Sequence, residues 1–179
     1  MPNDKTLSQF TTVAFLTLAI FLPSLAYPDT KNMDCIKNKY EKYLQQKKQW
    51  NVNVSKLVIE EEPRFAEVAK ELRLRETNLI EAQRIEFAFL VNENPGKLHL
   101  DRPLNQWVKL SKDEKKQLAA ADNNYALLVE YSWDRATPKS RSDRKLMISK
   151  IFTNRKIHPY VRKNKQHMEE ISKISCPKP

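Results

Sequence analysis

The sequence predicts an all-α protein, a compact bundle of about five helices around a long central helix at roughly residues 63–92. Three observations support this class. Gly96 is the single glycine among 179 residues, whereas tight β-hairpins depend on residues that tolerate positive φ. Apolar residues recur at helical spacing over long stretches. The segments between these stretches carry Asn and Pro, which favour loops.

The central helix is predicted from residues 63–91, a stretch with no glycine and no internal proline. At 1.5 Å per residue it spans roughly 44 Å, enough for the spine of a small domain. Pro63 suits a first helical turn, and the Asn, Pro and Gly at residues 92–96 end the helix. One apolar stripe at helical spacing predicts its buried face. The stripe consists of Phe65, Val68, Ala69, Leu72, Leu79, Ile80, Phe87, Leu90 and Val91.

The same periodicity predicts four further helices, at residues 34–50, 111–134, 143–154 and 159–174. Asp34 can cap the first of them, which we expect to end before an Asn-containing, β-branched break at residues 51–55. Ser111 and Glu114 have the spacing of a capping box, so they mark the start of the second. Residues 136–140, which include a proline, form a linker.

Residues 1–26 have the features of a secretory signal peptide. A polar start with Lys5 precedes an apolar run at residues 13–22, and small residues at Ser24 and Ala26 provide a cleavage site. The run is shorter than the roughly 20 residues of a transmembrane helix. We therefore expect cleavage after Ala26 and an exported protein, periplasmic or secreted, with residues 27–179 as a single helical domain.

Cys35 and Cys176 lie near the two ends of the expected mature chain. In an oxidising compartment such a pair predicts one disulfide, and the alternative is two free thiols. Closing so long a loop stabilises a protein by roughly 4–5 kcal/mol on the chain-entropy model. Asn53 opens a glycosylation sequon that matters only in a eukaryotic host, and the sequence leaves the host open.

The net charge of +10 is concentrated at the C-terminal end. Residues 139–179 hold twelve Lys or Arg against three acidic residues, whereas residues 57–97 hold nine Glu against six basic residues. A one-sided surplus favours an anionic envelope component or an acidic protein as partner, and the alternative is a solvated face without a partner. The leading interpretation is therefore a small exported binding protein, not an enzyme. Its candidate binding residues are Arg144, Lys145, Lys150, Arg155, Lys156, Arg162 and Lys163.

Polar residues interrupt the central stripe at Glu76 and Gln83, and Glu86 lies in a segment that is apolar on nearly every side. Buried carboxylates need partners, so these residues predict either structural pairs or a polar pocket of a small enzyme. Such a pocket in an exported, disulfide-containing, all-α protein resembles the secreted helical chorismate mutases in architecture and residue types. The resemblance implies a dianionic substrate, although no arginine-and-lysine motif of that family matches this chain.

Residues 110–118 are similar to the Leu-Thr-x-x-Gln helix starts of periplasmic Spy-type chaperones, with Glu114 where those have glutamine. This resemblance implies a third class, a periplasmic holdase chaperone with a dimeric cradle and exposed apolar patches. A capping box alone also explains the segment.

Other classes have little support. The three histidines His99, His158 and His167 form no His-x-x-x-His pair, and there is no Cys-x-x-Cys pair, so we predict no metal site. One glycine excludes a glycine-rich phosphate loop, and we expect no cofactor. Nucleic acid is not expected because the aromatic residues lie on apolar stripes and not among the basic ones. The basic amphipathic helix at residues 143–154 allows peripheral membrane contact at most.

Overall fold

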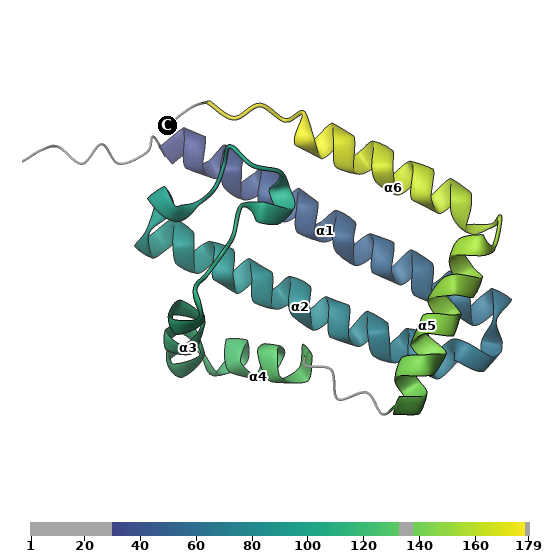
Figure 1. The fold of residues 1–179 in the computed structure, drawn as a ribbon. Coiled ribbons are helices and arrows are strands. Elements are labelled where there is room, and N and C mark those ends of the chain that lie inside the picture. The colour runs from purple at the N-terminus through teal and green to yellow at the C-terminus, as the bar shows by residue number, and fades with distance from the viewer. Residues whose placement is uncertain (1–29, 133–137, 178–179) are drawn as a thin grey trace, which may run out of the picture.

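Helices make up all the regular secondary structure in the described part of the chain, which comprises residues 30–132 and 138–177 of a computed structural model (Figure 1). The all-α prediction is confirmed, with six α-helices among the described residues. The predicted signal peptide and its cleavage site lie outside that part. The elements are α1 Thr30–Glu61, η1 Pro63–Phe65, α2 Ala66–Glu93, η2 Pro95–Lys97, η3 Leu104–Gln106, α3 Lys112–Ala121, α4 Asn123–Ser132, α5 Pro138–Thr153 and α6 Ile157–Ser172.

The two longest helices, α1 and α2, form an antiparallel pair at the centre of the fold (Figure 1). Helix α6 packs along the outer side of α1, and α4 packs along α2. Helix α5 crosses the ends of α1 and α2 at the end of the molecule away from the C-terminus (Figure 1). This crossing helix is the element that shapes the candidate binding surface.

Helix α1 is longer than the sequence predicts at both ends. It begins at Thr30, so Asp34 lies inside the helix and does not cap it. The expected break at residues 51–55 is wrong, because this segment is helical within the 32 residues of α1. Its side chains explain the difference, since Ser55, Leu57 and Val58 are buried. The Ser55 hydroxyl also donates to the Ala69 carbonyl of α2 at 3.4 Å. Packing against α2 and α5 therefore outweighs the weak helical propensity of the β-branched and Asn residues.

The predicted helix at residues 111–134 is instead two helices. Its capping box is present, because Ser111 Oγ accepts from the Glu114 backbone N–H and the Glu114 side chain accepts from that of Ser111. The chain leaves helical geometry at Asp122, with φ −129° and ψ 102°. The Asp122 carboxylate accepts from the backbone N–H of Tyr125 at 3.0 Å, as an N-cap side chain does. This local capping ends α3 and begins α4.

The two C-terminal helices begin before their predicted starts. Helix α5 begins at Pro138 instead of residue 143, and α6 begins at Ile157 instead of residue 159. Proline is tolerated in a first turn, where the missing N–H has no partner in any case. Pro138 and Pro159 both occupy such first-turn positions, so each lies inside its helix.

The buried apolar residues form two clusters. The larger cluster fills the space between the N-terminal half of α1, the C-terminal half of α2, and α3 and α4. Its members are Ile36, Tyr40, Tyr43, Leu44, Ile80, Ala82, Phe87, Leu90, Val91, Leu98, Trp107, Leu110, Leu118 and Tyr125. The smaller cluster lies where α5 crosses the other ends of α1 and α2. It contains Leu57, Val58, Phe65, Ala69, Met147, Ile151 and Ile157.

The predicted disulfide is confirmed. Cys35 of α1 and Cys176 are bonded, with 5.6 Å between their Cα atoms and a sequence separation of 141 residues. A second contact holds the same end, because Lys39 Nζ donates to the carbonyl oxygens of Ser172 at 2.8 Å and Ile174 at 2.6 Å. Ser172 is the last residue of α6 and Ile174 follows it, so Lys39 lies at the C-terminal end of this helix, where a cation is favourable. In the described chain, no helix is both long enough and apolar enough to cross a bilayer.

Candidate binding surface on α5 and α6

The seven candidate basic residues lie on α5, on α6 and on the turn between them. Two are paired with the acidic segment of the same chain. Lys156 Nζ lies 2.8 Å from Glu61 of α1, and the Arg144 guanidinium lies 3.9 Å from Glu71 of α2, with only 15% of the Arg144 side chain exposed. The hydrogen bond from Lys156 is the main reason that the pKa of Glu61 is lowered. Part of the basic surplus is therefore neutralised inside the fold.

The other five basic residues face solvent. All are exposed, and within the described chain none of them forms an ion pair. They are Lys145, Lys150, Arg155, Arg162 and Lys163. Five uncompensated cations on α5, α6 and the turn between them produce a positive potential that attracts anionic groups over about 8–10 Å at physiological ionic strength.

Helix α5 exposes large apolar residues beside these cations. The side chains of Met147 and Ile151 are buried, whereas Ile148 is 45% exposed and Phe152 is 51% exposed. Each exposed residue directly follows a buried one, so both lie about 100° round the helix, on one flank of α5. Only part of the apolar residues of α5 therefore pack into the core.

Two basic residues of α5 lie in the same row along the helix as Ile148 and Phe152. Arg141, Lys145, Ile148 and Phe152 follow one another at spacings of four, three and four residues, which places them in one row along a helix. Arg141 and Lys145 are exposed. Helix α5 thus presents a row that is cationic at its N-terminal end and apolar at its C-terminal end.

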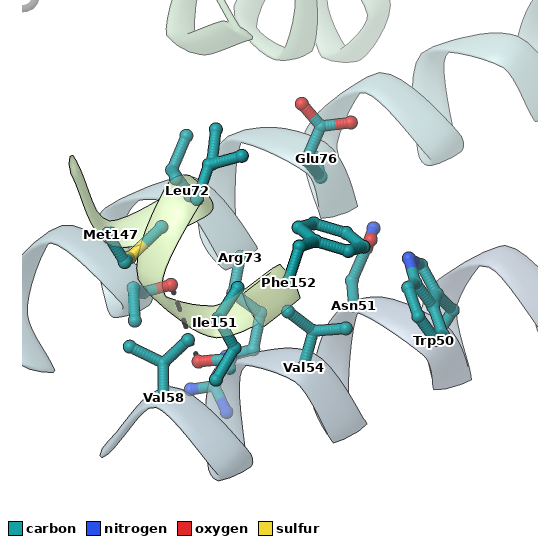
Figure 2. A pocket seen from close by; sticks show the side chains of 13 residues that line it. Trp50, Asn51, Val54, Val58, Leu72, Arg73, Glu76, Met147, Ile151 and Phe152 are labelled. Carbon is teal, nitrogen blue, oxygen red and sulfur yellow. Dashed lines mark hydrogen bonds between the residues drawn. The ribbon is translucent and has the colours of Figure 1, made fainter. Parts of the chain in front are cut away.

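An open apolar groove lies at the apolar end of this row (Figure 2). Helices α1, α2 and α5 form its walls, and its cavity volume is about 220 Å³. Figure 2 shows the Phe152 ring at the groove between Glu76 of α2 and Asn51 of α1. Most of the lining is apolar, with Arg73, Glu76, Asn51 and Ser55 as the polar members. The remaining lining residues are Trp50, Val54, Val58, Ala69, Leu72, Met147, Ile148, Ile151 and Phe152.

The three polar residues of the central helix are not brought together in one pocket. Glu76 lines the apolar groove. Gln83 accepts a hydrogen bond of 2.8 Å from Lys47 Nζ of α1. Burial lowers the pKa of Lys47, and the charge of Glu76 partly opposes this shift. Gln83 and Lys47 thus form a partly buried link between α1 and α2.

Glu86 lies on another side of α2, toward α3 and α4. Its Oε1 accepts a hydrogen bond of 2.7 Å from the Tyr125 hydroxyl and lies 3.1 Å from Lys115 Nζ. Burial, together with the hydrogen bond to Glu86 and its charge, raises the pKa of Tyr125 above its usual value. The carboxylate is thus paired, as a buried charge requires. A catalytic pocket needs groups that converge on one space, and Glu86 does not converge with Gln83.

His167 of α6 makes a polar contact with α1. His167 Nδ1 lies 3.1 Å from Gln46 Oε1 of α1, within hydrogen-bonding distance. Among the described residues, no group of three His, Cys, Asp or Glu side chains is placed to hold a metal ion.

No protein-family model matches the chain, and no curated protein or solved structure is significantly similar to it. The enzyme and holdase alternatives remain predictions.

Proposed function

We propose that this protein is an exported binding protein that docks an acidic protein segment on α5 and α6. The row of Arg141, Lys145, Ile148 and Phe152 beside the apolar groove carries this proposal. Carboxylates of the segment lie against the exposed cations, and an apolar side chain of the segment enters the groove. This combination matches the recognition of an amphipathic helix in a hydrophobic groove, where anchors are spaced three or four residues apart.

The groove favours a partner that carries an apolar side chain. Ile148 and Phe152 are about half exposed, and covering a side chain of that size removes apolar area worth roughly 25 cal/mol per Å². Arg141 and Lys145 favour a partner with negative charge, because both are exposed cations in the same row as Ile148 and Phe152. An acidic segment without apolar residues would match the charge of the surface but would leave the groove unfilled.

A protein segment fits this surface better than a flat bilayer does. Met147 and Ile151 point inward, so the outermost residues of α5 lie two positions away, about half a turn round the helix. Ser149 lies two positions from both Met147 and Ile151, and it is exposed. The apolar residues lie on the flanks, whereas a helix that inserts into a membrane surface places its apolar face outward.

The proposed location is outside the cytoplasm. The signal-peptide features of residues 1–26 support export. The Cys35–Cys176 disulfide supports it too, because such bonds persist in oxidising compartments and are rare in the cytosol.

Binding of a synthetic acidic peptide tests the proposal. The probe is a fluorescent peptide of about twelve residues, rich in glutamate, with two leucines at positions i and i+4. We expect saturable binding that weakens with added salt, because exposed charges are screened. The peptide with alanines in place of the leucines binds more weakly, and the peptide with lysines in place of the glutamates does not bind.

A matched pair of charge-reversed variants locates the binding. One carries K145E, K150E, R155E and R162E, and the other carries K37E, K42E, K109E and K112E at exposed sites of α1, α3 and the preceding loop. The first change weakens binding by at least about tenfold, because it replaces several attractive contacts by repulsive ones. Equal loss in the two variants, or equal binding of the leucine and alanine peptides, would contradict the proposal.

A further inference from the structure

A second groove lies between α1 and α6, and its lining differs from that of the apolar groove. Its volume is about 310 Å³, at the small end of the range for small-molecule sites, about 300–1,000 Å³. Four carboxamide side chains line it, together with Lys163, His167 and two aromatic rings. The carboxamides belong to Gln46, Gln49, Asn53 and Asn164, and the rings to Trp50 and Tyr160.

The polar side chains are held in place by one another. Gln46 Nε2 donates to Asn164 Oδ1 at 2.8 Å, and Gln46 Oε1 lies 3.1 Å from His167 Nδ1. On the α1 side, Gln49 Nε2 donates to Asn53 Oδ1 at 2.9 Å. Each of these contacts fixes a rotamer before a ligand arrives, which lowers the entropy cost of binding.

Hydrogen-bonding capacity remains on both sides of the groove. Within the described chain, the amide groups Nδ2 of Asn164 and Nδ2 of Asn53 donate to no protein atom, and Gln49 Oε1 accepts from none. The lining of the groove therefore offers both free donors and a free acceptor. Tyr160, which is 39% exposed, adds an aromatic body with a hydroxyl at its tip.

This chemistry narrows the class of ligand. A metal ion needs carboxylates or several imidazoles, which the groove lacks. A nucleotide or polyphosphate needs several cations, and Lys163 is the single Lys or Arg in the lining. An apolar ligand would leave the carboxamides without partners, which is costly. A ligand with many hydroxyls and at most one negative charge per binding unit satisfies the donors, the acceptors and the lysine.

We propose that the groove between α1 and α6 binds an acidic saccharide, with sugar hydroxyls on the carboxamides and one carboxylate on Lys163. The rings of Trp50 and Tyr160 contact the apolar C–H surface of the sugar. This site shares Lys163 with the exposed cations of α5 and α6, but its proposal does not depend on peptide binding at the apolar groove. Trp50 also borders the apolar groove, so it forms part of the wall between the two sites.

Titration of the isotopically labelled protein with trigalacturonate, and with its neutral methyl ester, tests this inference by NMR. We expect both sugars to shift the side-chain amide signals of Gln46 and Asn164 and the indole N–H signal of Trp50. Lys163→Gln weakens binding of the acid by about tenfold or more, as loss of a charged hydrogen bond does, and leaves binding of the ester unchanged. Asn164→Ala and Tyr160→Ala weaken binding of both sugars by about three- to tenfold.

Matched substitutions on the outer side of α6 serve as controls. Lys165→Gln and Gln166→Ala remove the same chemical groups from exposed positions outside the groove lining, so both sugars bind these variants normally. The K145E, K150E, R155E, R162E variant also binds the sugars, which separates this site from the peptide surface. The inference is overturned if no saturable shift occurs at about 10 mM sugar, where a 1 mM site would be about nine-tenths filled. Binding that survives both Asn164→Ala and Tyr160→Ala would overturn it as well.

Discussion

The Tyr125 hydroxyl donates a hydrogen bond of 2.7 Å to Glu86 Oε1, and this bond joins α4 to α2 inside the protein. Tyr125 is 1% exposed and Glu86 is 7% exposed. Tyr125→Phe keeps the ring but removes the donor, so the buried carboxylate loses one of its two partners. We expect a loss of about 1–3 kcal/mol in the free energy of unfolding, measured with urea.

Tyr131→Phe is the control for that prediction. Tyr131 lies on the same helix and is 65% exposed. Its hydroxyl can contact water in the folded and the unfolded chain, so its removal changes the free energy of unfolding little. A loss of equal size in both variants would show that the Tyr125–Glu86 bond has no special role.

The same environment predicts a loss of stability at alkaline pH. Burial raises the pKa of Tyr40, and burial with the neighbouring Glu86 raises that of Tyr125, both above the ordinary value of 10.0. Above pH 10 the unfolded chain therefore releases these protons first. The free energy of unfolding then falls by up to about 1.4 kcal/mol per pH unit for each tyrosine. Urea titrations between pH 8 and about 11 measure this slope, which Tyr40→Phe and Tyr125→Phe each reduce. Identical slopes in all three proteins would refute the assignment.

We expect the protein to lose stability in acid as well, because of Glu114. A hydrogen bond from Lys97, followed by those of the Ser111 backbone and side chain, lowers the pKa of Glu114 from 4.5 to about 2. Its contribution to stability is thus present above pH 4.5 and is lost as the pH falls toward 2. Glu114→Gln lowers the urea midpoint at pH 7, and the difference from the unchanged protein shrinks steadily below pH 4.5.

Asp113→Asn is the matched change for Glu114→Gln. Asp113 is exposed in the same first turn and lies 4.0 Å from Lys116. We expect Asp113→Asn to lower the urea midpoint at pH 7 by less than Glu114→Gln does. A difference between the Glu114→Gln and unchanged proteins that persists at pH 2 would mean that the carboxylate is not its source.

The disulfide predicts a large change in stability without a change of fold. Replacing Cys35 and Cys176 by serine together opens a covalent loop that spans a separation of 141 residues. We expect the free energy of unfolding to fall by up to roughly 4–5 kcal/mol, while far-ultraviolet circular dichroism stays helical. Urea unfolding of the double variant, compared with the oxidised protein, measures the loss. Equal stability of the two proteins would contradict this estimate.

Local sequence signals predict the features that depend on local geometry. The capping box at Ser111 and the Cys35–Cys176 bond are present. Of the apolar stripe predicted for the central helix, Val68, Leu72 and Leu79 are half-buried and the other members are buried. The break expected at residues 51–55 fails because burial of Leu57 and Val58 under η1 and α5 was not visible from propensity. The end of α3 at Asp122 rests on one carboxylate-to-backbone contact, and a run of Asp and Asn permits that contact without requiring it.

The candidate surface was predictable only in part. The basic residues of α5 and α6 stand out in the sequence, but the pairing of Arg144 and Lys156 with Glu71 and Glu61 depends on the packing of distant helices. The apolar groove depends on the position at which α5 crosses α1 and α2. Periodicity marks Ile148 and Phe152 as apolar, and only the tertiary structure shows that they flank an opening instead of filling the core.

The most direct measurement of the central claim locates the apolar side chain of a bound acidic segment. The probe peptide carries a nitroxide label next to one of its leucines, and the protein is labelled at its Ile and Leu methyl groups. We predict paramagnetic broadening of the Ile148 and Ile151 signals at the groove, with the Leu127 signals unchanged, since Leu127 is 50% exposed on α4, away from α5. Broadening centred on Leu127, or equal broadening of all exposed methyl groups, would contradict docking on α5.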